Sequence, residues 1–237
     1  MRARDISADE RVIVALDVPD MAGLQGLLDR LQGRPRFFKV GLELFVPEGA
    51  RAVEAVQKRG GKVFLDLKLH DIPETVARAV ANATSLGAEL LTVHTAGGFE
   101  MMRRAADTAK GKPGILGVTV LTSLSEEDLR ADGIPATVRE TVLRRALLAE
   151  KAGAIGIVCS PQEVVDVRAA SSKLVLVVPG VRPAGAALGD QKRVATPASA
   201  IAAGADYLVV GRPIRDAEDP AAAFTALVRE VESALDA

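Results

Sequence analysis

Acidic and basic residues alternate in the run Asp66-Leu67-Lys68-Leu69-His70-Asp71. Asp66 and Lys68 stand two residues apart at the end of an apolar stretch that is typical of a β-strand. Since side chains alternate between the faces of a strand, we expect both on the same side of the backbone. An acid–base–acid pattern of this kind suits either proton transfer or metal binding.

Asp17 and Lys39 occupy similar places at the ends of two earlier apolar stretches. Taken alone, Asp17 fits a turn residue equally well, and Lys39 fits a structural lysine whose ammonium reaches water. Taken together with Asp66, Lys68 and Asp71, they form a set of two lysines and three acids. Charges are seldom buried unless paired, and at about 4 Å each contact contributes about 4 kcal/mol before desolvation. The set therefore predicts a preorganised charged site.

A second group of candidates follows two later strands. Pro179-Gly180-Val181-Arg182 ends one, and Gly211-Arg212 ends the next. These are the last two of the eight strands that we predict below. In many barrel enzymes the loops after the seventh and eighth strands hold a phosphate, and an arginine guanidinium binds phosphate through two parallel N–H donors. The competing interpretation is an arginine paired with an acid on the barrel rim.

Other polar residues at strand ends carry weaker signals. His94 fits an inward, hydrogen-bonded histidine better than a general acid or base. We find no His/Asp partner pattern that would make Cys159 or Ser160 a nucleophile, so we interpret both as packing or rim residues. Thr122 and Ser123 could offer hydroxyls to a ligand.

Apolar runs alternate with alanine-rich stretches of helical period, which indicates a parallel sheet with crossover helices. The predicted strands are Val12–Val18, Phe37–Leu42, Lys62–Lys68, Leu90–Thr95, Ile115–Leu121, Ile155–Ser160, Leu174–Pro179 and Tyr207–Gly211. The predicted helices are Met21–Leu31, Pro47–Arg59, Pro73–Leu86, Phe99–Ala109, Thr137–Lys151, Pro161–Ala169, Pro197–Ala203 and Pro220–Leu235.

Eight evenly spaced units favour a closed (β/α)8 TIM barrel over an open, doubly wound sheet. We find no composition break, so residues 1–237 are predicted to form a single domain. Two connections, 122–136 and 180–196, are longer than the rest and would lie on the face where barrel active sites form.

Composition narrows the class of protein. The formal net charge is −1 and there is no Trp, so nothing points to nucleic acid or an anionic membrane as a partner. No apolar run has the length of a membrane span, and the N-terminus does not resemble a signal peptide. One Cys and two His exclude a cysteine or histidine metal cluster, and a reducing cytoplasm fits.

The charged run and its surroundings resemble the signature of the orotidine 5'-monophosphate decarboxylases, in their bacterial form. The resemblance extends in order from residue 12 to 214. The matching segments are Ala15-Leu16-Asp17, Phe38-Lys39-Val40-Gly41, Phe64 to Val76, Leu121-Thr122-Ser123, Pro179-Gly180-Val181-Arg182, Asp190-Gln191 and Val210-Gly211-Arg212.

The resemblance implies an enzyme of UMP biosynthesis that works without metal or organic cofactor. Lys68 would donate a proton to C6 of the pyrimidine, with Asp66, Lys39 and Asp71 as the charged network around it. The other implied contacts are Asp17 and Lys39 to ribose, Thr122 to the base, and Pro179, Arg182, Gln191, Gly211 and Arg212 at the phosphate. The enzyme would be a homodimer in which Asp71 and Thr75 reach the neighbouring subunit's site.

Two alternatives remain open at this point. A metal-dependent sugar-phosphate decarboxylase or aldol-type synthase on a similar barrel would use the same acids as metal ligands. A barrel that binds a phosphorylated ligand without catalysis has the same fold. The His70-Asp71-Ile72-Pro73 continuation and the Asp17/Lys39 pair favour the nucleotide enzyme over the first, and Lys68 between two acids argues against the second.

Overall fold

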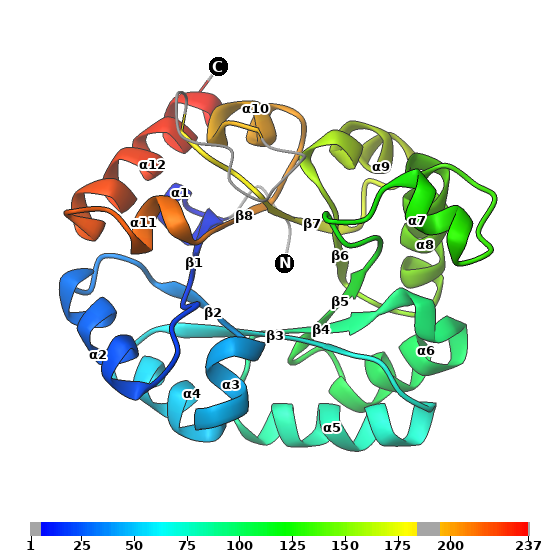
Figure 1. Ribbon diagram of the computed structural model, residues 1–237, viewed down its shortest axis with the longest axis horizontal. Coiled ribbons are helices and arrows are strands. Elements are labelled where there is room, and N and C mark those ends of the chain that lie inside the picture. The colour runs from blue at the N-terminus through cyan, green and yellow to red at the C-terminus, as the bar shows by residue number, and fades with distance from the viewer. Residues whose placement is uncertain (1–5, 184–194, 237) are drawn as a thin grey trace.

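The computed structural model describes residues 6–183 and 195–236. Within them, eight parallel strands form a closed barrel in sequence order, and the last strand pairs with the first (Figure 1). The strands are β1 (Val12–Ala15), β2 (Phe37–Gly41), β3 (Lys62–Leu69), β4 (Leu90–His94), β5 (Gly114–Val118), β6 (Gly156–Val158), β7 (Val175–Pro179) and β8 (Tyr207–Val210). The closed barrel predicted from the alternating pattern is confirmed, and the open sheet is excluded.

Helices surround the barrel and cover the outer faces of its strands (Figure 1). The helices are α1 (Ala8–Arg11), α2 (Met21–Arg30), α3 (Leu42–Glu48), α4 (Ala50–Gln57), α5 (Pro73–Ser85), α6 (Gly98–Ala109), α7 (Glu126–Ala131), α8 (Val138–Lys151), α9 (Val164–Ala170), α10 (Pro197–Ala202), α11 (Arg212–Arg215) and α12 (Pro220–Leu235), with short 3-10 turns η2 (Thr95–Gly97) and η3 (Pro161–Glu163). Among the described residues, no helix is long and apolar enough to cross a bilayer.

The helix predicted at Pro47–Arg59 is wrong, because two helices occupy this region. α3 begins directly after β2 and contains Pro47 near its end. Gly49 then takes a φ of 52°, and its N–H donates to the Phe45 carbonyl at 2.8 Å, which ends α3 before α4 begins. A positive φ costs glycine little conformational energy, so the helix ends at Gly49 and not at Pro47.

The barrel interior is filled by a small cluster of alternate strand residues, while the larger core lies between the strands and the helices. Phe37, Phe64 and Leu90 belong to the interior cluster and lie at the N-terminal ends of their strands. Residues two positions further along each strand also point inward, but they lie nearer the C-terminal ends. In these three strands those positions are polar, which is why the site forms there.

A buried ion pair stabilises the N-terminal end of the barrel, opposite the end where the polar positions lie. The Asp206 carboxylate, on a residue only 4% exposed, lies 2.7 Å from Arg168 Nη2 and accepts the Leu176 N–H at 2.7 Å. Arg11 donates to the Asp206 carbonyl at 3.1 Å. These bonds hold β8 between its neighbours, in keeping with a stabilising role for this end of a barrel.

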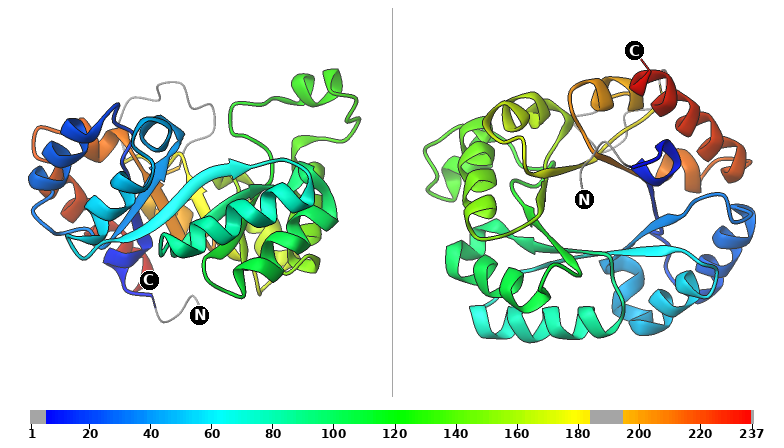
Figure 2. Two further views of the ribbon diagram at one scale, coloured as in Figure 1. Left: turned by 90° about the horizontal axis from the view of Figure 1, so that it is seen from below. Right: turned by 180° about the vertical axis from the view of Figure 1, so that it is seen from behind.

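The two long predicted loops differ in what they contain. The connection after β5 includes α7, which projects from one end of the barrel, while α1 lies at the other end (left panel of Figure 2). Ser125 begins α7 with a capping box to Asp128. Of the connection after β7, residues 184–194 lie outside the described part of the chain.

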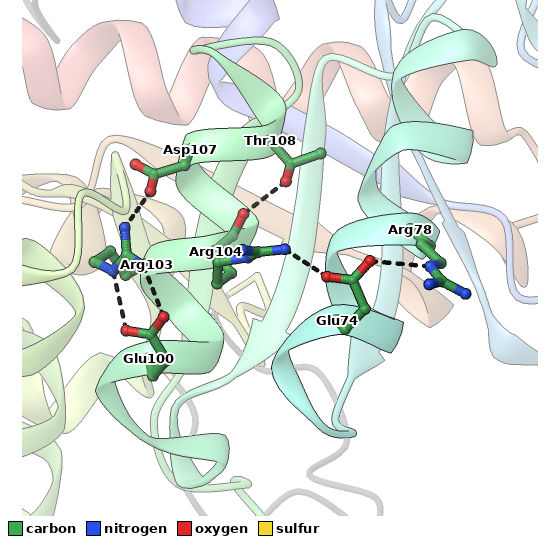
Figure 3. Close-up of polar contacts among 7 residues, drawn as sticks. All are labelled: Glu74, Arg78, Glu100, Arg103, Arg104, Asp107 and Thr108. Carbon is green, nitrogen blue, oxygen red and sulfur yellow. Dashed lines mark hydrogen bonds and ion pairs between the residues drawn. The ribbon is translucent and has the colours of Figure 1, made fainter.

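Exposed ion pairs connect the outer surfaces of α5 and α6 (Figure 3). Glu74 contacts Arg78 of its own helix at 3.1 Å and Arg104 of α6, and its side chain is 53% exposed. Exposed pairs contribute about 0–1 kcal/mol each. The packing of α5 against α6 therefore depends mainly on buried residues such as Val80 and Met101.

Candidate active site

Four charged side chains form a row at the C-terminal ends of the first three strands. Lys39 Nζ lies 2.9 Å from Asp17 Oδ1 and 3.6 Å from Asp66 Oδ2, and Lys68 Nζ lies 2.8 Å from Asp66 Oδ1. The order along the row is Asp17, Lys39, Asp66, Lys68, so that every charge has an opposite neighbour. Such an arrangement holds both ammonium groups in defined positions without a large net charge.

Strand register explains why these side chains meet. Lys39 is paired in register with Ala15 of β1 and with Phe64 of β3. Gly41 leaves the space that the row needs, because a Cβ atom at that position would lie 2.7 Å from Lys39 Nζ. A larger residue at position 41 would displace the ammonium that links the two carboxylates.

Lys68 has an unusual backbone conformation. Its φ is 50°, in the left-handed region that residues other than glycine seldom adopt. The register between β3 and β4 also shifts between Leu65 and Leu69. The Lys68 N–H donates to Thr92 Oγ1 at 2.9 Å, and that hydroxyl donates to Asp66 Oδ1 at 3.0 Å. Thr92 therefore holds both the strained backbone and the carboxylate.

Thr92 was not among the residues singled out from sequence. It is completely buried in the middle of β4, within Leu-Leu-Thr-Val-His. Its signal in the sequence was a hydroxyl among the apolar residues that precede His94 in this strand.

Asp66 is the central carboxylate of the row, and its side chain is 14% exposed. Burial on its own would raise the pKa of Asp66. The opposite charges of Lys39 and Lys68, with hydrogen bonds from Lys68 and Thr92, outweigh burial, so the pKa lies below its ordinary value. Asp66 is consequently ionised at neutral pH.

Asp71 and Thr75 lie apart from this row. Both are exposed, and Asp71 Oδ1 accepts the N–H of Ile72 at 2.6 Å. In the described part of the chain, no ion pair joins Asp71 to Lys39 or Lys68. Of the predicted charged set, one chain therefore brings Asp17 and Asp66 together with the two lysines but not Asp71, because β3 continues to Leu69 and the chain then turns towards α5.

A cavity of about 170 Å³ adjoins the two lysines of the row. Its wall is largely apolar and includes Val120, Leu121 and Val158, and Thr122 and Pro179 also line it. A flat, largely apolar heterocycle fits such a space, and Thr122 supplies a hydroxyl for orientation.

A second cavity, of about 340 Å³, shares Lys39 and Pro179 with the first. It is lined by Asp17, Gly180, Arg182, Gly211, Arg212 and Arg215, together with Glu43 and six less polar or shared positions. Within the part of the chain that the structure describes, Arg182 Nε is buried without a hydrogen-bond partner. A phosphate group would satisfy this donor, and the predicted phosphate ligands that the structure describes lie around this space. Gln191 lies outside the described residues.

The two histidines stack on each other beside the row, with ring centroids 5.2 Å apart and an interplanar angle of 20°. His94 Nδ1 accepts the Ala96 N–H at 3.2 Å, as expected of an inward, hydrogen-bonded histidine. Burial, followed by the electrostatic influence of His70, Arg145 and Lys68, lowers the pKa of His94 to about 4. His94 is therefore neutral at pH 7.

Cys159 is buried in the wall of the 170 Å³ cavity. Burial raises the pKa of its thiol above the ordinary value, so the thiolate is disfavoured. This agrees with the interpretation of Cys159 as a packing residue rather than a nucleophile.

A third and larger cavity, of about 600 Å³, opens at the N-terminal end of the barrel. Lys62 and Lys112 at its rim are already paired with Glu10 and Glu89, at 2.7 and 2.8 Å. It lacks the row of charges and lies at the end that stabilises barrels, so we do not assign the chemistry to it. Among the described residues, no group of three His, Cys, Asp or Glu side chains is arranged to hold a metal ion.

The closed barrel and the charged, two-part cavity at its C-terminal end define a barrel enzyme of the kind that acts on small phosphorylated molecules. Residues 10–227 match the model of the orotidine 5'-phosphate decarboxylase / HUMPS family. The chain belongs to this family.

Relatives with known names give a consistent picture. The chain is 50% identical over 235 residues to the orotidine 5'-phosphate decarboxylase of Moorella thermoacetica, covering 95% of this chain and 93% of that protein. It is 50% identical over 231 residues to the protein of the same name from Geobacter sulfurreducens, covering 94% and 97%. Among solved structures, orotidine 5'-phosphate decarboxylase from Lactobacillus acidophilus superposes with a TM-score of 0.83 at 37% identity, covering 94% and 99%.

Proposed function

We propose that this chain decarboxylates orotidine 5'-monophosphate to uridine 5'-monophosphate, a step of pyrimidine biosynthesis. The observation that carries the proposal is the position of Lys68. Its ammonium is held 2.8 Å from Asp66 at the wall of a cavity for a heterocycle, next to an arginine-lined cavity for a phosphate. Family membership supports the same activity.

Lys68 suits the difficult step of this reaction. Breaking the bond between C6 and the carboxylate leaves an electron pair on an sp2 carbon, with no adjacent group to accept it. A fixed ammonium stabilises the developing negative charge and then gives a proton to C6, while CO2 leaves. Asp66 and Thr92 hold Lys68 in place, and Lys39 supplies a second positive charge within the same row.

The remaining proposed substrate contacts are those implied by the resemblance, and most of these residues line the second cavity. Asp17 and Lys39 would bind ribose hydroxyls, and Thr122 would contact the base. Arg182, Gly211 and Arg212 would bind the phosphate together with Pro179 and Gln191. Phosphate binding is remote from C6, but it can contribute to catalysis by ordering the groups around the substrate.

The proposal includes a homodimer with shared active sites. Asp71 and Thr75 are exposed at the end of β3 and the start of α5, outside their own chain's row. A second subunit placed against this region would receive both side chains. We also place the enzyme in the cytoplasm, where the lone cysteine would stay reduced.

Activity and its independence of metal can be tested in one experiment. We expect the ultraviolet absorbance of orotidine 5'-monophosphate to decay at the same rate with and without EDTA. The structural reason is that Lys39 occupies the position between Asp17 and Asp66 where a metal would be needed. Loss of activity in EDTA, restored by Mg²⁺, would indicate a metal-dependent enzyme of this barrel type. Binding of the nucleotide without turnover would indicate a non-catalytic barrel.

Arg212→Ala is expected to raise KM for orotidine 5'-monophosphate by about 100-fold, because a charge-assisted contact to phosphate contributes about 1.5–3 kcal/mol. Steady-state kinetics with the nucleotide and with orotidine, which lacks the phosphate, measures the effect. Orotidine should be handled equally by both forms of the enzyme. If the variant loses as much activity on orotidine as on the nucleotide, Arg212 does not act through the phosphate.

A further inference from the structure

Arg215, at the end of α11, connects two parts of the site that are far apart in sequence. Its Nη1 donates to the backbone carbonyl of Asp17 at 2.6 Å. Its Nε and Nη2 contact the two carboxylate oxygens of Asp216 at 2.6 and 3.0 Å. The guanidinium is therefore oriented by Asp216 and directed at the segment after β1.

The backbone at Asp17 needs such support. β1 ends at Ala15, so Asp17 lies beyond the regular pairing of the strand. Its side chain begins the charged row through the 2.9 Å contact with Lys39. A small movement of the Asp17 backbone would therefore change both its own contact with ribose and the position of Lys39.

The other end of the connection is the phosphate cavity. α11 begins at Arg212, directly after Gly211, and the Arg215 N–H donates to the Gly211 carbonyl at 2.9 Å. A single turn of helix thus separates the proposed phosphate ligands from Arg215. Through these two hydrogen bonds Arg215 links the backbone of Gly211 to the backbone of Asp17.

We propose that Arg215 is a positioning residue, which holds Asp17 in register with Gly211 and Arg212 and so connects the phosphate site to the charged row. The inference rests on the proposed function. Arg215 also lines the phosphate cavity, but its charge is compensated by the bidentate contact with Asp216.

The test is a double-mutant cycle between Arg215 and Asp17. Arg215→Ala should lower kcat/KM for orotidine 5'-monophosphate by about 10- to 100-fold, the effect of losing a charge-assisted hydrogen bond. In the Asp17→Ala background the same substitution should cost no more than about 3-fold, because no carboxylate remains to be positioned. Arg215→Lys, which keeps one donor, should recover part of the activity.

Binding provides a readout that does not depend on turnover. By calorimetry, Arg215→Ala should weaken UMP, which presents ribose and phosphate, but leave inorganic phosphate affinity unchanged. Arg212→Ala should weaken both. Arg139→Ala removes an arginine in a similar bidentate contact, to Asp166 on the exterior, and serves as the control with unchanged kinetics.

Several results would overturn the inference. Equal losses from Arg215→Ala with and without the Asp17 carboxylate would show that Arg215 acts independently of Asp17. Weakened binding of inorganic phosphate would make Arg215 a direct phosphate ligand. An inactive wild-type enzyme would refute the proposed function alone, since the UMP and phosphate measurements would still decide the role of Arg215.

Discussion

Lys68→Ala should lower kcat for decarboxylation by on the order of 10⁴-fold or more, with the fold intact. One preorganised electrostatic contact is worth about 10²- to 10³-fold in rate, and a positioned proton donor about 10²- to 10⁴-fold. Lys68 would supply both to C6. The measurement is single-turnover decay of orotidine 5'-monophosphate absorbance at saturating enzyme.

The matched control lies on the same strand. Lys62 begins β3 at the other end of the barrel, where its ammonium pairs with Glu10 at 2.7 Å. Lys62→Ala should leave kcat within about 2-fold, since no substrate contact is lost. Thermal unfolding of both variants checks the fold, and Asp66 keeps Lys39 as a partner when Lys68 is removed. If Lys68→Ala retained substantial activity with a normal Tm, Lys68 would not be the proton donor.

Asp71→Ala should reduce activity by on the order of 10²-fold or more in the homodimer, because each active site would lose a partner-supplied carboxylate. Mixing it with inactive Lys68→Ala subunits should restore activity. In a mixed dimer, one site combines an intact Lys68 with an intact Asp71, and the other site lacks both. With half of the dimers mixed and one good site in each, about one quarter of wild-type activity is expected.

A second mixture distinguishes shared sites from non-specific rescue. Lys68 and Arg212 belong to the same chain's site, so mixing Lys68→Ala with Arg212→Ala subunits should restore nothing at low substrate concentration. The dimers must be allowed to exchange subunits, and exchange can be followed by mass spectrometry of the intact assembly. If mixed dimers of the Asp71 and Lys68 variants form but stay inactive, or if the enzyme is monomeric, the shared-site proposal is wrong.

The eightfold order of the barrel follows from local pattern. Short apolar runs and helical stretches alternate, and glycines with positive φ, such as Gly60 and Gly204, follow the ends of α4 and α10. The start of α3 was missed because Pro47 was expected to open a helix. In the structure it lies inside α3, and Gly49 ends that helix.

The charged residues at strand ends could also be identified from the local sequence pattern. A charge inside an apolar run is unusual wherever it occurs, so Lys39, Asp66 and Lys68 stand out without knowledge of their neighbours. Thr92 did not stand out, because threonine is an ordinary strand residue. Its role arises from the shifted pairing of β3 with β4, a property of two strands rather than of either one.

Residue types and their spacing thus settle which side chains are available and which face of a strand they occupy, because the period of a strand is two residues. Only the closed barrel decides which of them meet. It separates Asp71 from Asp66 and Lys68 although all three lie within six residues, and it brings Arg215 to the backbone of Asp17 across 198 positions. Such contacts depend on strand register and on the left-handed turn at Lys68, and both are imposed by packing between elements distant in the chain.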